Sequence, residues 1–413
     1  MDLVLSMDVK ARARELNDYV VALRRELHAH PEVDHDLPFT ESVILRELEK
    51  MNLDEVRAGQ GRGHGVLATL KGGRAWPGKN LALRADMDAL PIREETGLPF
   101  ASADGAMHAC GHDAHVAMLL GAAKLLSEAR EELSGTVRFI FQPAEETEDG
   151  AASMIRSGAL ENPAVDEIVG LHTGNVWSGL TPGQIGWKTG PMMAATVMFR
   201  VLFRGKGGHG ATPHLTVDPI VMAAEAIAQL QILVSREVSP FEPAVVTVGQ
   251  IQGGTVCNVI ADCCEFSGMI RSFSPELHGR LKKRVRDVTE GVAASMRGKA
   301  EVSFSEGLAA VVNDEGCVHR MRDIAAETLG TEGVRELALP SSGAEDFSCY
   351  LAKVPGAFFF HCAAFAPRDG AEEERNWPHH NARFDVNESV LWTGVAAMTA
   401  YALRRREYMG SAD

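Results

Sequence analysis

The sequence predicts an α/β main domain, with helices on both faces of a mixed sheet, that is interrupted by a small ferredoxin-like α+β domain. The chain has 413 residues, which is long for one hydrophobic core. Helical and strand patterns alternate in its first part. After Gly190 the order becomes strand, helix, strand, strand, helix, strand, which is typical of a ferredoxin-like unit. We therefore expect residues 1–190 and 306–413 to form the main domain around an insert of residues 191–305.

The first part of the chain gives the elements of the main domain in order. Val20 to His28 continues a helix that Pro31 ends. Thr40 is predicted to cap a helix over Val43 to Met51. Short apolar runs rich in β-branched residues predict strands, and the apolar-periodic run 116–126 predicts a helix. The expected strands cover 66–70, 81–84, 137–141 and 168–171.

The insert and the last part follow from the same periodicities. In the insert we expect strands at 196–203, 244–251, 265–272 and 301–304, with helices at 219–233 and 275–296. Beyond residue 308 the α/β pattern returns, with a helix at 344–351, a strand at 356–360 and a final helix at 386–404.

Composition excludes several classes of protein. The formal net charge is −15 with a pI near 5.5, so no basic surplus exists to neutralise nucleic-acid phosphates. No apolar run approaches a membrane span, and Met1 to Met7 is too short for a signal sequence. Seven cysteines without regular spacing argue against a disulfide framework. We therefore expect an acidic cytoplasmic protein that acts on small molecules.

Five residues form a candidate set of metal ligands. Cys110 and His112 flank one glycine directly before the helix at 116–126, so a loop could aim both at one point. Two more candidates follow strands, and one lies in a polar loop. Five ligands exceed the needs of one tetrahedral ion, which favours a dinuclear site in which Cys110 bridges the metals. The five are Cys110, His112, Glu146, His172 and His380.

Glu145 is the candidate acid and base. Neighbouring residues at a strand end face different directions, so Glu146 can bind metal while Glu145 stays beside an activated water. Asp86 also follows a strand, and we weigh an orienting carboxylate evenly against an ordinary turn residue. His115, His214 and His379 are interpreted as supporting residues rather than ligands.

The motifs resemble those of the M20 metallopeptidases, and specifically of their amidohydrolase subfamily. The motifs in family order are A-C-G-H-D-A-H, Q-P-A-E-E, G-L-H, G-K-G-G-H-G-A-T-P-H, S-S-G-A-E-D-F and H-N-A-R-F-D. The resemblance implies a zinc-peptidase-like catalytic domain, a dinuclear centre with the ligands above, and an inserted lid domain that mediates homodimerisation. It also implies that His209 stabilises the oxyanion, often from the partner subunit. By the same resemblance, Asn258, Arg271 and Gly343 contact the substrate.

Two segments depart from the family pattern. The usual N-V-I-P reads Asn258-Val259-Ile260-Ala261, and the G-L-H segment lacks its downstream proline. Both lie near the expected substrate pocket, so they weaken any transfer of specificity.

The resemblance implies hydrolysis of N-acyl L-amino acids of the acetyl, benzoyl or indoleacetyl type. The alternatives are a dipeptidase, an N-carbamoyl-amino-acid hydrolase, an N-acetyl-diaminopimelate deacetylase, or a non-catalytic binder of amino-acid conjugates. Thiolate, imidazole and carboxylate ligands suit Zn²⁺, with Mn²⁺, Co²⁺ and Ni²⁺ as further candidates.

Overall fold

The computed structural model describes residues 7–74, 78–175, 177, 179–366 and 375–408. It separates into two compact units: unit 1 comprises Met1–Met192, Val312–Leu339 and Asp346–Asp413, and unit 2 comprises Met193–Val311 and Pro340–Glu345. Residues 1–6, which entered the argument against a signal sequence, lie outside the described residues. No helix among the described residues has both the length and the apolar character needed to cross a membrane.

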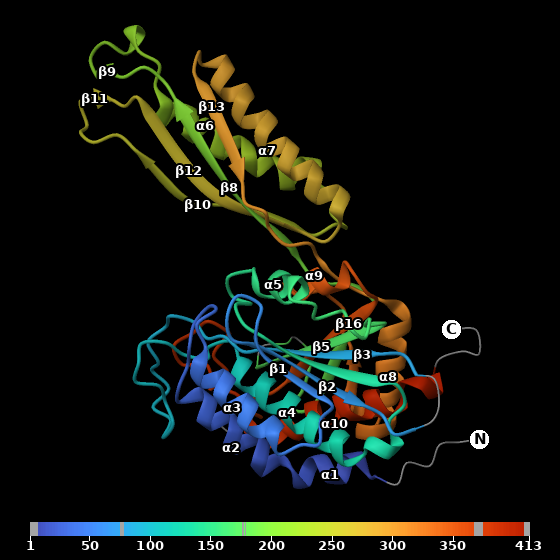
Figure 1. The fold of residues 1–413 in the computed structure, drawn as a ribbon. Helices are drawn as coiled ribbons and strands as arrows, with labels where there is room; N and C mark the ends of the chain where they lie inside the picture. The colour runs from blue at the N-terminus through green and yellow to red at the C-terminus, as the bar shows by residue number, and fades with distance from the viewer. Residues whose placement is uncertain (1–6, 75–77, 176, 178, 367–374, 409–413) are drawn as a thin grey trace. The chain divides into compact units, whose positions relative to one another are not determined.

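Unit 1 is built on an eight-stranded mixed sheet with the order β1-β2-β4-β3-β5-β16-β6-β15 (Figure 1). Strands β3, β4, β5 and β16 run parallel, β1 and β2 pair antiparallel with their neighbours, and β6 is antiparallel to β16 but parallel to β15. The predicted α/β class with a mixed sheet is therefore confirmed. The strands are β1 (Glu55–Gln60), β2 (Gly65–Lys71), β3 (Leu81–Asp86), β4 (Thr136–Gln142), β5 (Glu167–Gly174), β6 (Ile185–Trp187), β15 (Val334–Glu336) and β16 (Gly356–Cys362).

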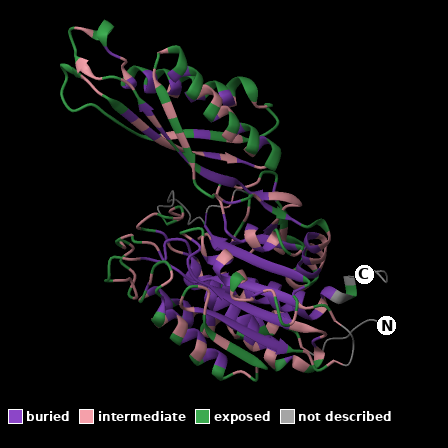
Figure 2. Ribbon diagram, turned by 45° about the horizontal axis from the view of Figure 1, so that its top comes forward, coloured by how far each residue is buried: buried purple, intermediate pink, exposed green. Residues whose placement is uncertain are grey.

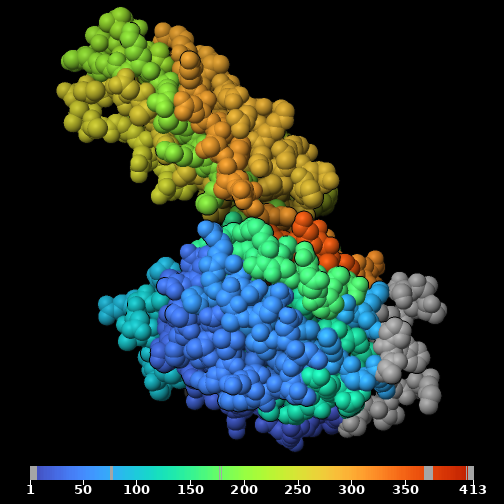
Figure 3. Space-filling model, viewed as in Figure 1, coloured from blue at the N-terminus to red at the C-terminus, as the bar shows by residue number. Residues whose placement is uncertain are grey.

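The helices of unit 1 bury the apolar central strands. Every residue of β3 and β5 is buried, as expected of parallel strands covered on both faces (Figure 2). Helices α4 and α10 lie beneath the sheet, and α5 and α9 lie above it (Figure 1). N-terminal segments cover the side of unit 1 seen in the space-filling view (Figure 3). The helices are α1 (Val9–Glu15), α2 (Asn17–His28), α3 (Pro38–Glu49), α4 (His112–Glu128), α5 (Gly150–Arg156), α8 (Glu315–Leu329), α9 (Ser348–Leu351) and α10 (Leu391–Arg404).

Three predicted helix starts were wrong. Helix α3 begins at Pro38, so Thr40 lies inside its first turn instead of capping it. The carboxylate of Glu32 accepts the backbone N–H groups of Phe39 and Thr40, both at 2.9 Å, and so supplies the cap from outside the helix. Helix α10 begins at Leu391 instead of Val386, and only Ser348–Leu351 of the predicted helix 344–351 is helical.

Unit 2 is a four-stranded antiparallel sheet with the order β10-β12-β8-β13, covered on one face by α6 and α7. Its core includes Phe199, Phe203 and Phe266. A two-stranded ribbon of β9 and β11 continues beyond one end of this sheet (Figure 1). The elements are β8 (Ala195–Arg204), β9 (Gly208–His209), α6 (Pro219–Ile232), β10 (Ala244–Gly253), β11 (Val259–Ile260), β12 (Cys263–Ser272), α7 (Pro275–Ser295) and β13 (Lys299–Phe304). Short strands β7 (Gly190–Met193) and β14 (Val311–Asn313) lie where the chain passes between the units.

Pro340–Glu345 belongs to unit 2, although the sequence analysis placed it in the main domain. The reason is hydrogen bonding: Ala194 N–H donates to the carbonyl of Gly343 at 2.8 Å, and the guanidinium of Arg271 donates to the carbonyl of Ser342 at 2.8 Å.

Candidate metal centre

Cys110 and His112 are aimed by the start of helix α4. Gly111 between them has φ +85°, in the left-handed region, and a side chain there would crowd Thr173. His112 is the first residue of the helix, and its Nδ1 bonds the carbonyl of Asp88 at 2.9 Å. Its Nε2 is therefore the nitrogen left for a metal, and it is buried without a hydrogen-bond partner.

Glu145 and Glu146 follow strand β4 on a turn that Asp88 holds. The two carboxylate oxygens of Asp88 accept the backbone N–H groups of Glu145, at 3.0 Å, and Glu146, at 3.1 Å. Ala144 before them has φ +58°, a strained conformation for a residue with a side chain. Sequence reasoning missed Asp88. The signal was its spacing from Asp86, because residues two apart at a strand end point the same way.

His172 lies on β5, and the peptide groups of Thr173 orient it. Its Nδ1 donates to the carbonyl of Thr173 at 2.9 Å, so its Nε2 faces the Sγ of Cys110 at 3.4 Å. His379 donates to the same carbonyl, at 3.2 Å. The N–H of Thr173 donates to Nε2 of His115 at 2.7 Å, which leaves the proton of His115 on Nδ1. His115 and His379 thus support a ligand, as predicted for supporting residues.

His380 comes from the loop before α10 and has φ +65°. Its N–H donates to the carbonyl of Ala109 at 2.8 Å, which ties this loop to the Cys110 loop. Its Nε2 lies 3.3 Å from Oε1 of Glu146. The His380 side chain is 54% exposed, whereas His112 is fully buried, so the centre opens to solvent on the His380 side.

The ligand atoms form two sets that share one residue. The atoms of Cys110, His112 and His172 lie within 4.8 Å of one another, and so do those of Cys110, Glu146 and His380. The structure therefore brings all five predicted ligands together, with Cys110 common to both sets. A third set of the same size joins His112, Glu145 and Glu146.

The electrostatics of this centre fit bound cations. Burial and the carboxylates of Glu146 and Glu145 raise the pKa of the Cys110 thiol well above its usual range. Burial alone would lower the pKa of His112. The negative charge of Asp86 and the hydrogen bond between His112 and Asp88 outweigh burial, and the pKa of His112 is raised to about 10. Oε1 of Glu146 is buried without a hydrogen-bond partner. Without cations, the raised pKa values mean that the Cys110 thiol and the His112 ring keep their protons. Bound cations would take the place of these protons, so the residues present fit two metal ions.

Asp86 is fully buried and links the centre to the core. Its Oδ1 accepts from Nδ1 of His115 at 2.5 Å, and its Oδ2 accepts from Arg84 at 2.6 Å and lies 3.7 Å from Nε2 of His112. Burial opposes ionisation, but the charge of Arg84 holds the pKa of Asp86 well below its usual range. Arg84 also donates to Asp346 at 2.8 Å. These contacts fit a carboxylate that orients its neighbours better than an ordinary turn residue.

The remaining predicted residues lie in unit 2. His209 and Asn258 are exposed neighbours on the β9 and β11 ribbon, where Gly210 N–H donates to the Asn258 carbonyl at 2.8 Å. Arg271 lies at the other end of β12, away from this ribbon. There it contacts the segment 340–345, which contains Gly343 and is distant in sequence. His214 is exposed in a short 3₁₀ helix near His209. The roles of these residues stay predictions.

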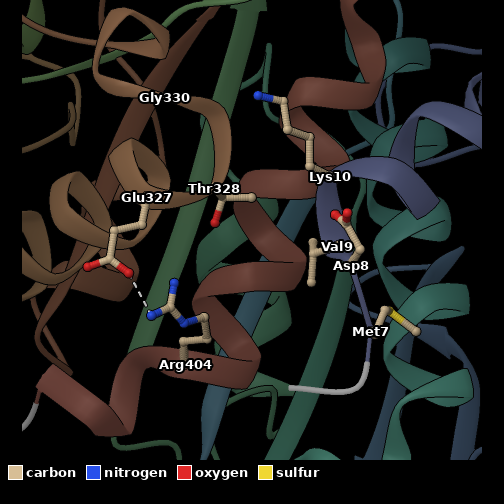
Figure 4. A pocket seen from close by; sticks show the side chains of 8 residues that line it. All are labelled: Met7, Asp8, Val9, Lys10, Glu327, Thr328, Gly330 and Arg404. Carbon is tan, nitrogen blue, oxygen red and sulfur yellow. Dashed lines mark hydrogen bonds and ion pairs between the residues drawn. The ribbon is translucent and has the colours of Figure 1, made fainter. Parts of the chain in front are cut away.

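A cavity of about 500 Å³ lies elsewhere in unit 1, between the start of α1 and the ends of α8 and α10 (Figure 4). Its charged side chains have partners: Lys10 donates to the carbonyl of Leu329 at 3.1 Å, and Arg404 pairs with Glu327 at 2.6 Å. No predicted site residue lines it.

Known proteins resemble the chain over nearly its whole length. It is 40% identical to an N-acetyl-L-cysteine deacetylase of Bacillus subtilis over 91% of this chain and 85% of that protein. It is 39% identical to the IAA-amino acid hydrolase ILR1-like 4 of Arabidopsis thaliana, over 95% and 87% of the two chains. The crystal structure of Bacillus subtilis YxeP, a dinuclear metal-binding peptidase of the M20 family, superimposes with a TM-score of 0.81 at 36% identity, covering 96% and 99% of the two chains.

The model of one family matches most of the sequence. Peptidase family M20/M25/M40 matches residues 82–404, a range that includes all five candidate ligands and Glu145. The architecture, the two ligand sets and the relatives agree on a metal-dependent hydrolase. The chain belongs to peptidase family M20/M25/M40.

Proposed function

We propose that the chain hydrolyses the amide bond of N-acyl L-amino acids, releasing a carboxylic acid and a free amino acid. The observation that carries the proposal is the pair of ligand sets that share Cys110, with the carboxylate of Glu145 beside them. Relatives named as N-acetyl-L-cysteine deacetylase and IAA-amino acid hydrolase act on substrates of this class.

Cys110, His112, Glu146, His172 and His380 would hold two divalent cations, Mn²⁺ or Zn²⁺, with Co²⁺ and Ni²⁺ as further candidates. When bound, such ions supply Lewis acidity toward the amide carbonyl and lower the pKa of water. Asp86 and Asp88 position this set: Asp86 orients His115 and stands beside His112, and Asp88 fixes the Glu145 and Glu146 backbone.

Glu145 moves the proton in this mechanism. Its carboxylate takes a proton from the attacking water and later gives it to the leaving nitrogen. Asp88 holds the Glu145 N–H at 3.0 Å, so the base is placed by a buried contact rather than by a free turn. The amide of Glu145→Gln cannot take up and release a proton as the carboxylate does, so this variant should stop turnover.

Arg271 would hold the α-carboxylate of the substrate. It is half-buried at the end of β12, and among the described residues no carboxylate forms an ion pair with it. The guanidinium pairs bidentately with carboxylates, which suits this role. The Gly343 segment lies against it, since Arg271 donates to the neighbouring Ser342 carbonyl.

His209 and Asn258 would act from the partner subunit of a homodimer. Eight residues of β12 separate Cys263, near their ribbon, from Arg271, which corresponds to about 26 Å of strand. An N-acyl amino acid is shorter than this, so one substrate cannot touch Arg271 and His209 of the same unit 2. Exposed apolar side chains near the ribbon support an interface there: Leu215, Ile220, Val221, Val256 and Val259.

Mixed dimers test the role in trans. His209→Ala and Glu145→Gln are each expected to be inactive, but a heterodimer of the two would contain one complete site. Co-refolded or co-expressed variants should recover about a quarter of wild-type activity. No recovery, with heterodimers present, would refute the trans role of His209.

The proposed compartment is the cytoplasm. All seven cysteines lie among the described residues and none forms a disulfide, as is usual in a reducing compartment.

A substrate panel tests the reaction. Chelated protein is reloaded with Mn²⁺ or Zn²⁺ and offered N-acetyl, N-benzoyl, N-indoleacetyl and N-carbamoyl amino acids, N-acetyl-diaminopimelate and dipeptides. Metal-dependent release of amino acid from one of the first three classes supports the proposal. Release only from carbamoyl compounds, N-acetyl-diaminopimelate or dipeptides would favour the corresponding alternative, and silence with metal bound would favour a binding protein.

A further inference from the structure

One end of the open sheet face in unit 2 carries an apolar patch beside Arg271. On β12, Arg271 pairs in register with Val245 of β10 and Thr196 of β8. Two residues earlier, Met269 pairs with Met198 of β8. Because side chains two residues apart share a face and cross-strand partners are neighbours, these side chains lie together. We call Met198, Met269 and Val245 the Met patch.

The Met patch is exposed although its neighbours in sequence are core residues. Val197 and Ile270 point to the opposite face and are buried under the helices, whereas Met198 is 61% exposed and Val245 40% exposed. Single exposed apolar side chains are common, but Met198 and Val245 adjoin Met269 and so form a contiguous apolar patch, which is the kind that marks a binding surface. The position therefore calls for a ligand or a partner.

Farther along the strands this open face is mostly polar, with Leu202 half-buried between two ion pairs. Arg200 pairs with Glu265 farther along the strands, and Arg204 pairs with Glu301 beyond them. Met198 and Val245, the large apolar side chains that are exposed on this face, thus lie at the end of the sheet that carries Arg271. A guanidinium that forms no ion pair with a carboxylate among the described residues, next to an apolar patch, matches the chemistry of an amino acid with an apolar side chain.

We propose that the Met patch binds the side chain of the amino acid in the substrate and makes the enzyme selective for apolar amino acids. The proposal rests on the proposed function, in which Arg271 holds the α-carboxylate. The substrate side chain is attached to the carbon next to that carboxylate, so it reaches the residues that flank Arg271 on the same face. Methionine side chains are flexible and polarisable, so they can pack against methionine, leucine or phenylalanine alike.

The test compares rates across amino acids with the acyl group fixed. Metal-loaded full-length protein is assayed for kcat/KM with L-methionine, L-leucine, L-glutamate and L-lysine that are each acylated with the group preferred in the substrate panel. Burying part of an apolar side chain predicts a preference of about tenfold or more for the first two. If all four are hydrolysed with equal kcat/KM, the inference fails and the proposed function stands. If none is hydrolysed with metal bound, both fail.

Met198→Lys locates the preference on the Met patch. An ammonium group there should lower the ratio of kcat/KM for the methionine over the glutamate substrate by about tenfold, while Arg271 still binds both α-carboxylates. The neutral variant Met198→Thr should lower the methionine to glutamate ratio less. Because Met198 is mostly exposed, these variants should fold, which metal content and thermal unfolding will verify.

Leu202→Lys is the matched control. Leu202 lies on the same strand and the same face, four residues and about 13 Å from Met198, between Glu265 and Glu301. At physiological salt this separation exceeds the screening length, so the ratio should stay at its wild-type value. An unchanged ratio in Met198→Lys, or an equal change in Leu202→Lys, would overturn the assignment to the Met patch.

Discussion

Asp88→Asn tests how the centre holds its two glutamates. The Asp88 carboxylate is buried and accepts two backbone N–H groups, at 3.0 and 3.1 Å. An asparagine keeps one acceptor oxygen but turns an NH₂ group toward the other N–H. Hydrogen bonds to a charged group contribute about 1.5–3 kcal/mol each, so the variant loses about 2 kcal/mol of support for this turn. Metal affinity should fall by about 10- to 100-fold, the usual effect of losing a group that orients a ligand.

The assay is chelator competition with Mn²⁺ or Zn²⁺, followed by kcat at saturating metal. Saturating metal should restore Glu146 of Asp88→Asn as a ligand, but it should not restore the position of Glu145. The kcat of the variant should therefore stay about 100-fold below that of the wild type, as for a base displaced by about 1 Å. Asp104→Asn, which changes an exposed carboxylate in the loop at residues 101–106, is the control. Wild-type metal affinity and kcat in Asp88→Asn would refute the argument that Asp88 positions the two glutamates.

Three further predictions concern metal protection, substrate binding and pH. Because Cys110 is buried, its alkylation is measured in enough urea to open the metal-free protein; bound metal should protect Cys110 there while exposed Cys263 reacts in either state, which peptide mass spectrometry will show, and equal labelling of Cys110 with and without metal would contradict its role as a ligand. Arg271→Lys should raise KM by about tenfold with little change in kcat, because it loses a bidentate pair; a change in kcat alone would argue against carboxylate binding. His28 lies between Asp113 at 2.7 Å and Glu94 at 3.2 Å; burial and Arg24 lower its pKa, but these carboxylates outweigh them and raise it above its ordinary value of 6.5. Its stabilising effect is therefore full below about pH 6.5 and is lost as pH rises through the higher folded value, so thermal unfolding of His28→Asn should differ most from wild type at low pH. A difference that grows with pH would contradict this sign.

The sequence could predict that the five candidate ligands lie together, because their chemistry and their position at element ends were both visible. Cys110 precedes an apolar helix and His112 begins it. Glu146 follows a buried strand and His172 lies near the end of another, where α/β folds gather side chains at one edge. The geometry then placed all five within two sets of atoms. The number of ligands predicted that one residue would be shared between two metals, and Cys110 was the residue proposed for that place.

Other features depend on contacts between distant segments. The cap of α3 comes from Glu32, which no local capping pattern indicates. The role of Asp88 depends on how β3 and β4 lie side by side, which sets the distance to the Glu145 turn. Pro340–Glu345 joins unit 2 through single hydrogen bonds that carry no periodic signal. Such pairings are decided by tertiary structure rather than by local preference.

Glu145→Gln, measured for metal content and turnover in the same sample, separates proton transfer from metal binding. Because Glu145 is proposed to move a proton and not to hold the cations, the variant should bind two metal ions per chain, like the wild type, and release no amino acid from the best N-acyl substrate. Loss of metal together with activity would show that Glu145 is a ligand. Turnover at the wild-type rate would contradict the proposed mechanism.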